Sequence, residues 1–346
     1  MTRDSLKRLS QALKDLRDYL KANESLSQIS RIDAKTLDGD AASIIESVRN
    51  AMLSPAKAAQ FLYSSVIIEL YGCLEAYVED LIEDYVRELN RLVSRYADLP
   101  KGLKANHRRL SGLFADRIES KANPGLVTVA DVIANLHSCL SGANGFVINA
   151  EAFAYHTANV RVPIVEKMFV DAGSASIMTT IGSDPRFRSV KDAIDPDTAD
   201  LFFRINDLAD RRNEVAHGAP SELLSVALLA QYIEVMDAFA NALFNATAIS
   251  LMPYARSTIA VNIGSPYQIL RAGRVALFDL QPGNSVHVND TIVAYSGDMP
   301  IRAGAISSLQ VDNANQISVT PAVPLKVGFG IDFRCKKRWE YWILPG

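Results

Sequence analysis

The chain has 346 residues, of which 49% are hydrophobic and 22% are charged, and its formal net charge is -3. These values are typical of a folded globular protein, so they exclude a disordered or fibrous chain. The net charge also excludes a globally basic nucleic-acid binder, although it leaves room for a local basic patch. The length favours about two domains.

Several features of the composition predict a cytoplasmic protein that binds neither a membrane nor a metal. The charged opening segment, residues 2–8, is unlike a secretory signal. Cys73, Cys139 and Cys335 lie far apart and outside any metal-ligand spacing, which favours reduced thiols. No uninterrupted apolar stretch approaches the roughly 20 residues that span a bilayer. The carboxylates show no spacing that demands a divalent metal, so we expect no cofactor.

Helical periodicity dominates the first 250 residues. Residues 4–22 are predicted to form an amphipathic helix with a stripe of leucines. Ser54 and Pro55 are a favourable cap and first-turn pair, and the apolar pattern continues from there to about Tyr96 as one very long helix or two in series. Between residues 101 and 195 we expect several shorter helices joined by loops. The stripe consists of Leu6, Leu9, Leu13, Leu16 and Leu20.

Two further helices are predicted on either side of a glycine. Asp197 is expected to cap a helix that ends with His217, because Gly218 directly after it is a typical stop signal. Ser221 and Glu222 are expected to open the next helix, which reaches about Ser250.

After Pro253 the pattern changes to short strands bounded by turn residues. Residues 257–261, 274–278 and 291–295 are predicted strands, and their spacing suggests a small sandwich or barrel. Residues 256–346 carry nine Lys or Arg and six Asp or Glu, a net charge of +3, whereas the preceding part carries 27 and 33, a net charge of -6. The fold class is therefore mainly α, with an N-terminal helical extension (1–54), a helical bundle (55–252) and a small, more basic all-β domain (256–346).

The most informative motif is the segment Arg212-Asn213-Glu214-Val215-Ala216-His217-Gly218. It places a permanent cation and a side chain that titrates near neutrality at one helix end. Such a pair can hold a phosphate and move a proton, which is most of what metal-free cleavage of RNA requires. A ribonuclease is therefore the leading hypothesis.

This segment resembles the R-N-x-x-x-H signature of HEPN proteins. The resemblance covers roughly residues 55–250 and implies a helical-bundle domain, often a metal-independent ribonuclease that acts as a dimer in toxin or antiviral systems. The helix around residues 70–81 looks like the first core helix of the family, in which an acidic residue faces the active site. On that basis Glu75 is a candidate catalytic residue.

The resemblance implies a reaction in which an RNA 2′-hydroxyl attacks the adjacent phosphate and leaves a 2′,3′-cyclic phosphate and a 5′-hydroxyl end. His217 would move the proton and Arg212 would stabilise charge on phosphorus. Positions five apart are about 140° apart on a helix, so these two side chains converge only if the last turn distorts or a second copy contributes. Asp210 and Asn213 share the stripe of His217. Asp210 or Glu75 could orient the imidazole, while Asn213 could fix a phosphate oxygen or a base edge.

Further candidates concern substrate binding. Arg211 directly precedes Arg212. Lys336, Lys337 and Arg338 with Trp339 interleave cations and an aromatic ring, a mixture that suits phosphates and unpaired bases. A terminal strand with exposed cations and a buried ring is the structural alternative. A second basic run, residues 101–109 with His107, is either an RNA-facing patch or a solvated helix face.

Three functions remain open at this point. The first is RNA cleavage, possibly of tRNA, in a toxin or phage-defence setting, by a homodimer with the active site at its interface and with a possible antitoxin or regulatory protein as partner. The second is a non-catalytic HEPN module that binds RNA, a nucleotide or a protein. The third is a scaffold or interaction protein whose histidine is structural. In the corresponding structural reading of the motif, Arg212 pairs with Asp207 or Asp210 and His217 merely caps the carbonyls at its helix end.

Overall fold

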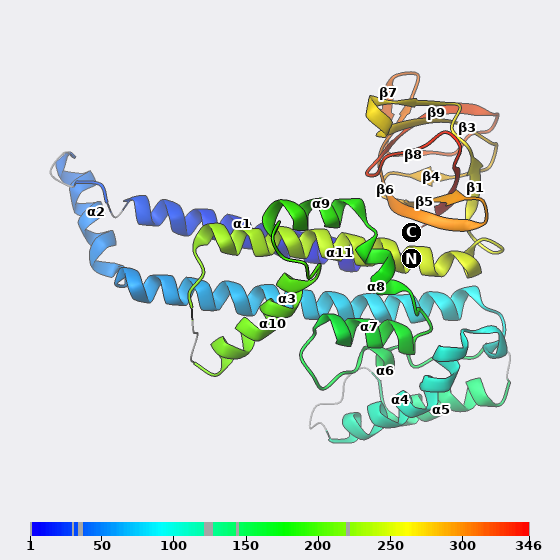
Figure 1. The fold of residues 1–346 in the computed structure, drawn as a ribbon, viewed down its shortest axis with the longest axis horizontal. Coiled ribbons are helices and arrows are strands. Elements are labelled where there is room, and N and C mark those ends of the chain that lie inside the picture. Colours follow the sequence, from blue (N-terminus) through cyan, green and yellow to red (C-terminus); the bar gives the residue numbers. More distant parts are fainter. Residues whose placement is uncertain are drawn as a thin grey trace.

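The computed structural model describes residues 2–29, 31–33, 37–120, 127–142, 145–218 and 222–345. In this part of the chain a helical region runs to Ala255 and is followed by an antiparallel β domain (Figure 1). The predicted fold class, mainly α with a small β domain, is confirmed.

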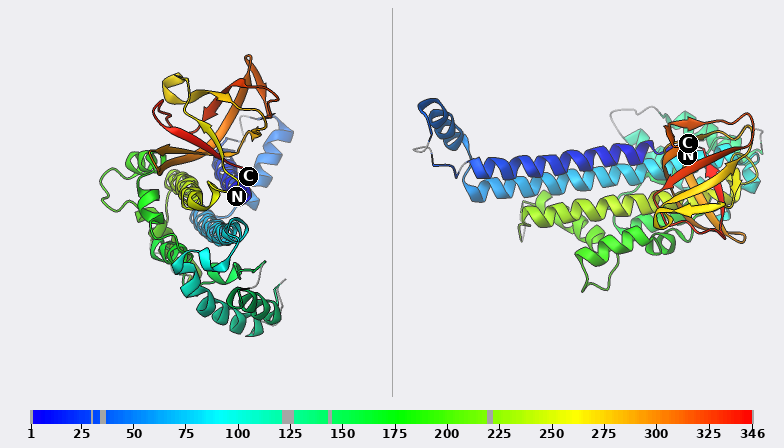
Figure 2. Two further views of the ribbon diagram at one scale, coloured as in Figure 1. Left: turned by 90° about the vertical axis from the view of Figure 1, so that its right-hand side faces the viewer. Right: turned by 90° about the horizontal axis from the view of Figure 1, so that it is seen from above.

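Three long helices form the centre of the helical region. They are α1 (Asp4–Ile29), α3 (Pro55–Leu92) and α11 (Val226–Ala255), and each packs against the other two. Figures 1 and 2 show them side by side along the long axis of the molecule. By length and composition alone α3 and α11 are apolar enough to cross a bilayer, but here their apolar faces form the core of the bundle. The apolar run after Pro55 is thus one unbroken helix.

The N-terminal 54 residues contain two helices with different surroundings. The predicted leucine stripe of α1 is buried and belongs to the core shared with α3 and α11. In contrast, α2 (Gly39–Ala51) has no buried residue among those described and lies at the far end of the bundle (Figure 1). Residues 1–54, expected to form an extension, therefore supply one layer of the bundle and one peripheral helix.

Shorter helices cover one side of this core, as the sequence predicted for residues 101–195. Their order ends with α9, which lies beside α11 and close to the β domain (Figure 1). A short 3-10 turn, η2 (Tyr96–Asp98), leads into them. The helices are α4 (Lys101–Ser120), α5 (Val129–Leu140), α6 (Glu151–Ala154), α7 (Val162–Asp171), α8 (Ile177–Gly182) and α9 (Pro185–Ile194).

His107 in α4 is a core residue and does not face solvent. It is fully buried, its Nε2 accepts a hydrogen bond from the Asn149 N–H at 3.1 Å, and its Nδ1 lies 3.1 Å from the Tyr96 hydroxyl. Burial lowers the pKa of His107 to about 4. His107 is therefore not accessible to RNA, which removes the histidine from the possible RNA-facing patch of residues 101–109.

The lowered pKa of His107 predicts a loss of stability in mild acid. Between pH 6.5 and pH 4 the unfolded chain binds a proton at His107, whereas the folded chain does not. The contribution of the neutral His107 to the free energy of unfolding is therefore complete above pH 6.5 and is lost as the pH falls toward 4. We expect His107 to contribute a loss of about 2 kcal/mol between pH 7 and pH 5. Urea unfolding at both pH values checks this, with His107→Gln as the comparison. Equal pH dependence in the two proteins would contradict the assignment.

The boundaries of the last two helices differ from the predicted ones. The next helix, α10, spans Phe203–Ala216, so Asp197 does not cap it. The residues before α10 form turns, in which the Asp200 carboxylate accepts from the Phe202 N–H at 2.9 Å. α11 begins after Ser225, whose hydroxyl accepts from the Leu228 N–H. Ser221, the predicted start, lies outside the described residues, and Pro253 lies inside α11 instead of ending it.

The β domain is a curled antiparallel sheet with the order β1-β10-β5-β6-β9-β3-β2, in which β7 also pairs with β6, and β4 and β8 form a separate pair. β1 contacts β3, near the other end of the order, so the sheet approaches a barrel. The predicted strands at 274–278 and 291–295 are present, whereas residues 257–260 form a turn before β1. The strands are β1 (Val261–Gly264), β2 (Gln268–Leu270), β3 (Val275–Leu280), β4 (Val286–His287), β5 (Thr291–Ser296), β6 (Met299–Val311), β7 (Ala314–Gln316), β8 (Ser318–Val319), β9 (Leu325–Ile331) and β10 (Glu340–Leu344).

The β domain is attached to the bundle by an extensive contact with α11. Val293 and Tyr295 of β5 are buried in the same core as the long helices. Arg256, just after α11, lies over the rings of Tyr295 and Trp342 at 4.7 and 4.8 Å. Because these contacts are apolar and aromatic, they fix the sheet above α11, as Figure 1 shows.

Candidate functional site

The end of α10 follows the helix-stop pattern that the sequence predicted. The His217 N–H donates to the Asn213 carbonyl at 3.0 Å, and the Gly218 N–H donates to the Val215 carbonyl at 3.0 Å, which tightens the last turn. Gly218 has φ +74°, a conformation that favours glycine. The His217 side chain is exposed beside this turn. It is therefore accessible to a ligand.

Arg212 points toward α3. Its guanidinium lies 5.3 Å from the centre of the Tyr71 ring, and its Nη1 lies 3.4 Å from Asn213 Oδ1. Among the described residues no ion pair with Asp207 or Asp210 holds it. The expected pairing of Arg212 with one of those carboxylates is therefore wrong. Arg212 is half-buried on an aromatic ring and keeps donors for an anion.

Tyr71 and Glu75 lie one turn apart on α3 and contact each other. The Tyr71 hydroxyl donates to Glu75 Oε1 at 2.8 Å and accepts from the Val160 N–H at 2.7 Å. Burial, together with the hydrogen bond to Glu75, raises the pKa of Tyr71. The phenol is therefore a permanent donor that holds Glu75, and its ring is the one over which Arg212 lies. Tyr71 was missed in the sequence, although its spacing of four from Glu75 places it on the same helix face.

Asp210 and Asn213 are engaged by the loop that precedes α7. Arg161 binds Asp210 through both terminal nitrogens, at 3.1 Å for Nη1. The Asn159 side-chain amide donates to Asn213 Oδ1. Asp210 therefore positions the loop against α10 and is not free to orient His217, which corrects that expectation. Asn213 keeps its own amide N–H₂ as a donor.

The same loop carries a second histidine, which the sequence analysis did not single out. His156 Nε2 lies 3.0 Å from Glu79 Oε1, one turn beyond Glu75 on α3, and its Nδ1 faces the Ala158 carbonyl. Both partners are acceptors, so both ring nitrogens must carry protons. The hydrogen bond to Glu79 outweighs burial and raises the pKa of His156. No local pattern predicts this contact, because the partners are 77 positions apart.

Removing the Glu79 charge is expected to lower the pKa of His156. In Glu79→Gln the main favourable partner of the imidazolium is gone, so the burial that opposes the charge dominates. In the wild type the stabilisation by this pair is complete below the unfolded pKa near 6.5 and is lost as the pH rises through the higher folded pKa. Histidine NMR titration checks this, with His156→Gln to assign the signal among the five histidines. An unchanged titration in Glu79→Gln would contradict the pairing.

Arg211, the neighbour of Arg212, faces the interior of the bundle. Its Nε donates to Asp207 Oδ2 at 2.6 Å and to the Tyr232 hydroxyl at 3.1 Å, and its Nη1 lies 3.4 Å from the Tyr63 hydroxyl. Only 16% of its side chain is exposed. Burial lowers the pKa of this guanidinium, but the hydrogen bonds outweigh that effect and raise it. Arg211 therefore ties α10 to α3 and α11, which corrects its expected role in substrate binding.

The C-terminal candidates lie in the β domain, apart from α10. In Figure 1 this domain lies above α11, whereas α10 ends below α3. Trp339 is only 7% exposed, and Lys336 Nζ lies 5.0 Å from the centre of its ring. Lys337 and Arg338 are exposed. The structure thus separates these four residues from the cluster around Arg212.

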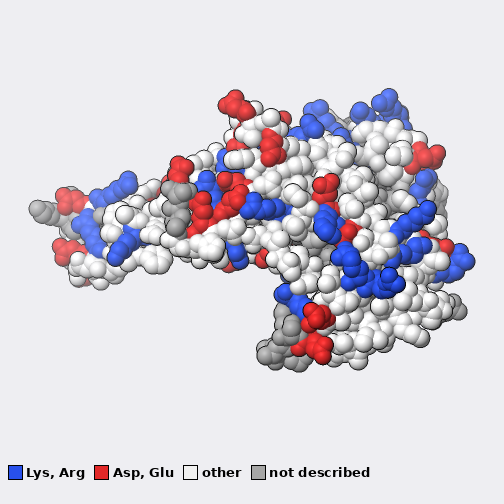
Figure 3. All heavy atoms as spheres, turned by 60° about the horizontal axis from the view of Figure 1, so that its bottom comes forward, with Lys and Arg blue, Asp and Glu red and all other residues white. Residues whose placement is uncertain are grey.

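The tertiary structure assembles one polar cluster from α3, the 155–161 loop and α10. We call it the α10 cluster, and it contains Tyr71, Glu75, Glu79, His156, Asn159, Arg161, Asp210, Arg212 and Asn213. His217 lies at its edge: its N–H donates to the Asn213 carbonyl, but its side chain forms no hydrogen bond to the cluster among the described residues. Figure 3 shows basic side chains gathered over the right-hand half of the face it draws and acidic ones along the middle. Positive potential on this face is therefore local, in agreement with the net charge.

A helical bundle with an R-N-x-x-x-H segment at a helix end is the architecture of the HEPN class. Residues 8–248, well over half of the chain, match the family model described as RiboL-PSP-HEPN. The chain therefore belongs to the RiboL-PSP-HEPN family. A HEPN domain is typical of a ribonuclease or an RNA-binding module. The match begins within α1 and ends before the β domain. No curated protein and no solved structure matches the chain.

Proposed function

We propose that this protein is a metal-independent endoribonuclease, and that the α10 cluster with His217 is its active site. The observation that carries the proposal is the placement of Arg212, which stacks on Tyr71 without a carboxylate partner while His217 stays exposed at the end of the same helix. A cation with free donors and an accessible imidazole are the two groups that in-line attack at phosphorus requires.

In the proposed reaction His217 takes the proton from the RNA 2′-hydroxyl, and the oxygen attacks the adjacent phosphorus. The bond from phosphorus to the 5′-oxygen breaks, and that oxygen receives a proton from an imidazolium. Arg212 stabilises the additional negative charge on the phosphoryl oxygens, and the Asn213 amide N–H₂ is in place to bind one of them. The products are a 2′,3′-cyclic phosphate and a 5′-hydroxyl.

The direct test is incubation of the purified protein with total RNA and tRNA in EDTA, followed by analysis of the product ends. Cleavage that survives chelation and leaves cyclic phosphate ends supports the proposal. RNA binding by the folded protein without any cleavage would favour the non-catalytic module instead.

We further propose that the active site is completed by a second copy. Regular helix geometry separates Arg212 and His217 by about 140°, and in one chain Arg212 points to Tyr71 while the His217 imidazole has no hydrogen bond among the described residues. A homodimer with the α10 ends facing each other would bring Arg212 of one copy to His217 of the other.

Mixing two inactive variants tests the shared site. A heterodimer of Arg212→Ala and His217→Ala retains one site with both groups intact only if the two groups come from different chains. Random exchange would then restore about a quarter of the wild-type activity. No recovery in a mixture that demonstrably forms heterodimers would show that each site belongs to one chain.

The cellular role that we propose is that of a toxin or antiviral effector, restrained by an antitoxin or another regulatory protein. This part rests on the family resemblance. Growth arrest on expression of the wild type, relieved by His217→Ala, is the expected result. Normal growth despite strong RNA cleavage in vitro would argue against the role.

A further inference from the structure

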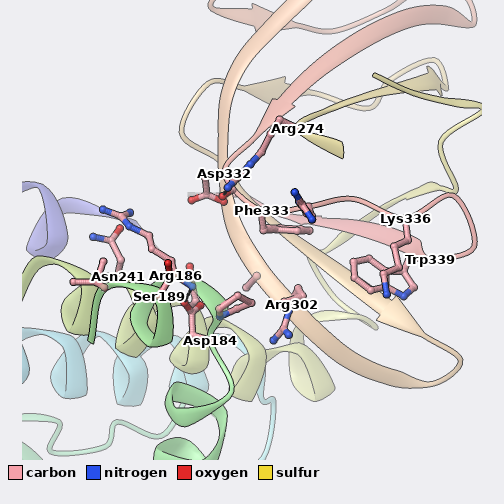
Figure 4. A pocket seen from close by; sticks show the side chains of 15 residues that line it. Asp184, Arg186, Ser189, Asn241, Arg274, Arg302, Asp332, Phe333, Lys336 and Trp339 are labelled. Carbon is pink, nitrogen blue, oxygen red and sulfur yellow. Dashed lines mark hydrogen bonds between the residues drawn. The ribbon is translucent and has the colours of Figure 1, made fainter. Parts of the chain in front are cut away.

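A second basic site lies at the seam between the helical bundle and the β domain. A cleft of about 850 Å³ separates α9 and α11 from Arg274 just before β3, from β6 and from the segment after β9. Figure 4 shows side chains from both domains converging on it, with Arg186 and Asn241 on the helical side and Arg274, Phe333, Lys336 and Trp339 on the other. The cleft and the end of α10 lie on opposite sides of the long helices in Figure 1.

The lining of this cleft is strongly cationic. It contains five cations and two carboxylates. One of the carboxylates, Asp184, already caps α9 by accepting from the Arg186 and Phe187 N–H groups at 2.9 and 3.0 Å. The cations are Arg186, Arg274, Arg302, Arg334 and Lys336.

Most of these cations have no carboxylate partner. Arg186 pairs with Asp237 at 3.0 Å, but Arg302 donates to the Ser183 carbonyl at 3.2 Å and Arg274 to the Asp332 carbonyl, both neutral acceptors. Among the described residues Arg334 and Lys336 form no ion pair. Cations gathered in a cleft with low-dielectric walls repel one another, which raises the electrostatic free energy of the empty cleft. An anionic ligand would lower that free energy.

The cleft also offers aromatic surface next to its cations. Phe333 is half-buried and lines the cleft, whereas the Trp339 ring is only 7% exposed and is covered by the Lys336 amine. A phosphate suits the guanidinium groups, whose donors form paired hydrogen bonds, and a flat heterocycle suits the Phe333 ring. A ligand that carries both features is a nucleotide.

The size and ends of the cleft favour a small ligand over a nucleic-acid strand. Its volume lies within the range of about 300–1,000 Å³ typical of small-molecule sites. The neighbouring exposed cations Lys337 and Arg338 do not line it, so the basic surface is not continued through them as a groove. We therefore propose that the seam between the two domains is a nucleotide-binding site, separate from the α10 cluster and independent of RNA cleavage.

Calorimetric titration of the full-length protein with ATP, AMP and inorganic pyrophosphate tests this proposal. We expect ATP to bind and to raise the melting temperature, because a ligand held from both sides favours the docked domains. The double variant Arg334→Glu/Lys336→Glu should weaken ATP binding by roughly tenfold or more, since each lost charge-assisted hydrogen bond costs about 1.5–3 kcal/mol, and roughly 1.4 kcal/mol is tenfold.

Matched variants separate this site from general attraction of anions. Lys337→Glu/Arg338→Glu makes the same change in charge outside the cleft and should alter ATP affinity less than twofold, whereas Arg186→Ala on the helical side should weaken it. Phe333→Ala should weaken ATP and AMP binding but leave pyrophosphate binding unchanged. This pattern would support a site that reads both base and phosphate.

Three results would overturn the proposal. Equal losses in Lys337→Glu/Arg338→Glu and in the cleft variant would indicate attraction by net charge alone. Pyrophosphate binding as tight as that of ATP, and no effect of Phe333→Ala, would indicate a plain anion site. Binding of an oligoribonucleotide through the cleft residues, with no binding of ATP or AMP, would make the cleft a strand-binding surface. None of these readouts uses RNA cleavage, so failure here leaves the proposed nuclease untouched.

Discussion

Replacement of His217 by alanine is expected to lower the rate of RNA cleavage by about 10²–10⁴-fold, the usual contribution of a positioned acid or base. The free energy of unfolding should stay within about 0.5 kcal/mol of the wild type, because the exposed imidazole supports no other described side chain. Initial cleavage rates, together with urea unfolding of both proteins, measure the two quantities.

The matched control for this prediction is His137→Ala, which removes another exposed histidine from the surface of α5. It should leave the cleavage rate unchanged. Equal activity of His217→Ala and the wild type would contradict the assignment of His217, and a comparable loss in both variants would point to a general effect of histidine removal. Arg212→Lys is a useful companion, since it keeps the charge and loses the planar fork that binds two phosphoryl oxygens.

Replacement of Arg211 by alanine is expected to destabilise the fold by about 3 kcal/mol, or roughly 6–12 °C in melting temperature. The change leaves the Asp207 carboxylate with Tyr232 as its only described partner and removes the donor to the buried Tyr63 hydroxyl. The cost of a partly buried carboxylate that has lost its cation is the main term. Thermal unfolding followed by circular dichroism measures the effect.

Arg212→Ala, one residue away, provides the internal comparison for Arg211. Among the described residues its guanidinium forms one hydrogen bond, to the Asn213 oxygen, and lies over the Tyr71 ring without an ion pair, so we expect little loss of stability and a large loss of cleavage. The stability of Arg211→Lys should fall between those of Arg211→Ala and the wild type. A lysine amine keeps the charge but lacks the planar guanidinium that donates to three acceptors at once. A stable Arg211→Ala protein beside an unstable Arg212→Ala protein would reverse the two assignments.

Much of the helical architecture is predictable because it depends on local periodicity. The leucine stripe of α1, the start of α3 at Pro55 and the stop at Gly218 each follow from patterns within a few residues, and all three agree with the structure. Boundaries were wrong where tertiary contacts override a local signal. Asp197 has the chemistry of a cap, but the residues after it are held in turns, and Arg204 at the start of α10 binds Asp195 instead, at 2.7 and 2.8 Å.

The candidate site was predictable only in part. The segment from Arg212 to His217 indicated the family, which the family match confirms. Arg212, His217 and, through the resemblance, Glu75 stay predicted site residues. Tyr71 and His156 were missed, because their partners are supplied by segments that fold back from other parts of the chain: the Tyr71 hydroxyl meets the Val160 N–H across 89 positions. Sequence spacing contains no information about contacts of that range.

The sequence by itself determined the two-part organisation, the long helices and the family, because apolar periodicity, turn residues and a short motif are encoded locally. The tertiary structure alone decided which charged groups are free to act. Arg211 and Arg212 are adjacent and chemically identical, yet successive positions on a helix point about 100° apart. Arg211 therefore forms hydrogen bonds with Asp207 and Tyr232, whereas Arg212 lies over the Tyr71 ring and keeps N–H donors for a ligand.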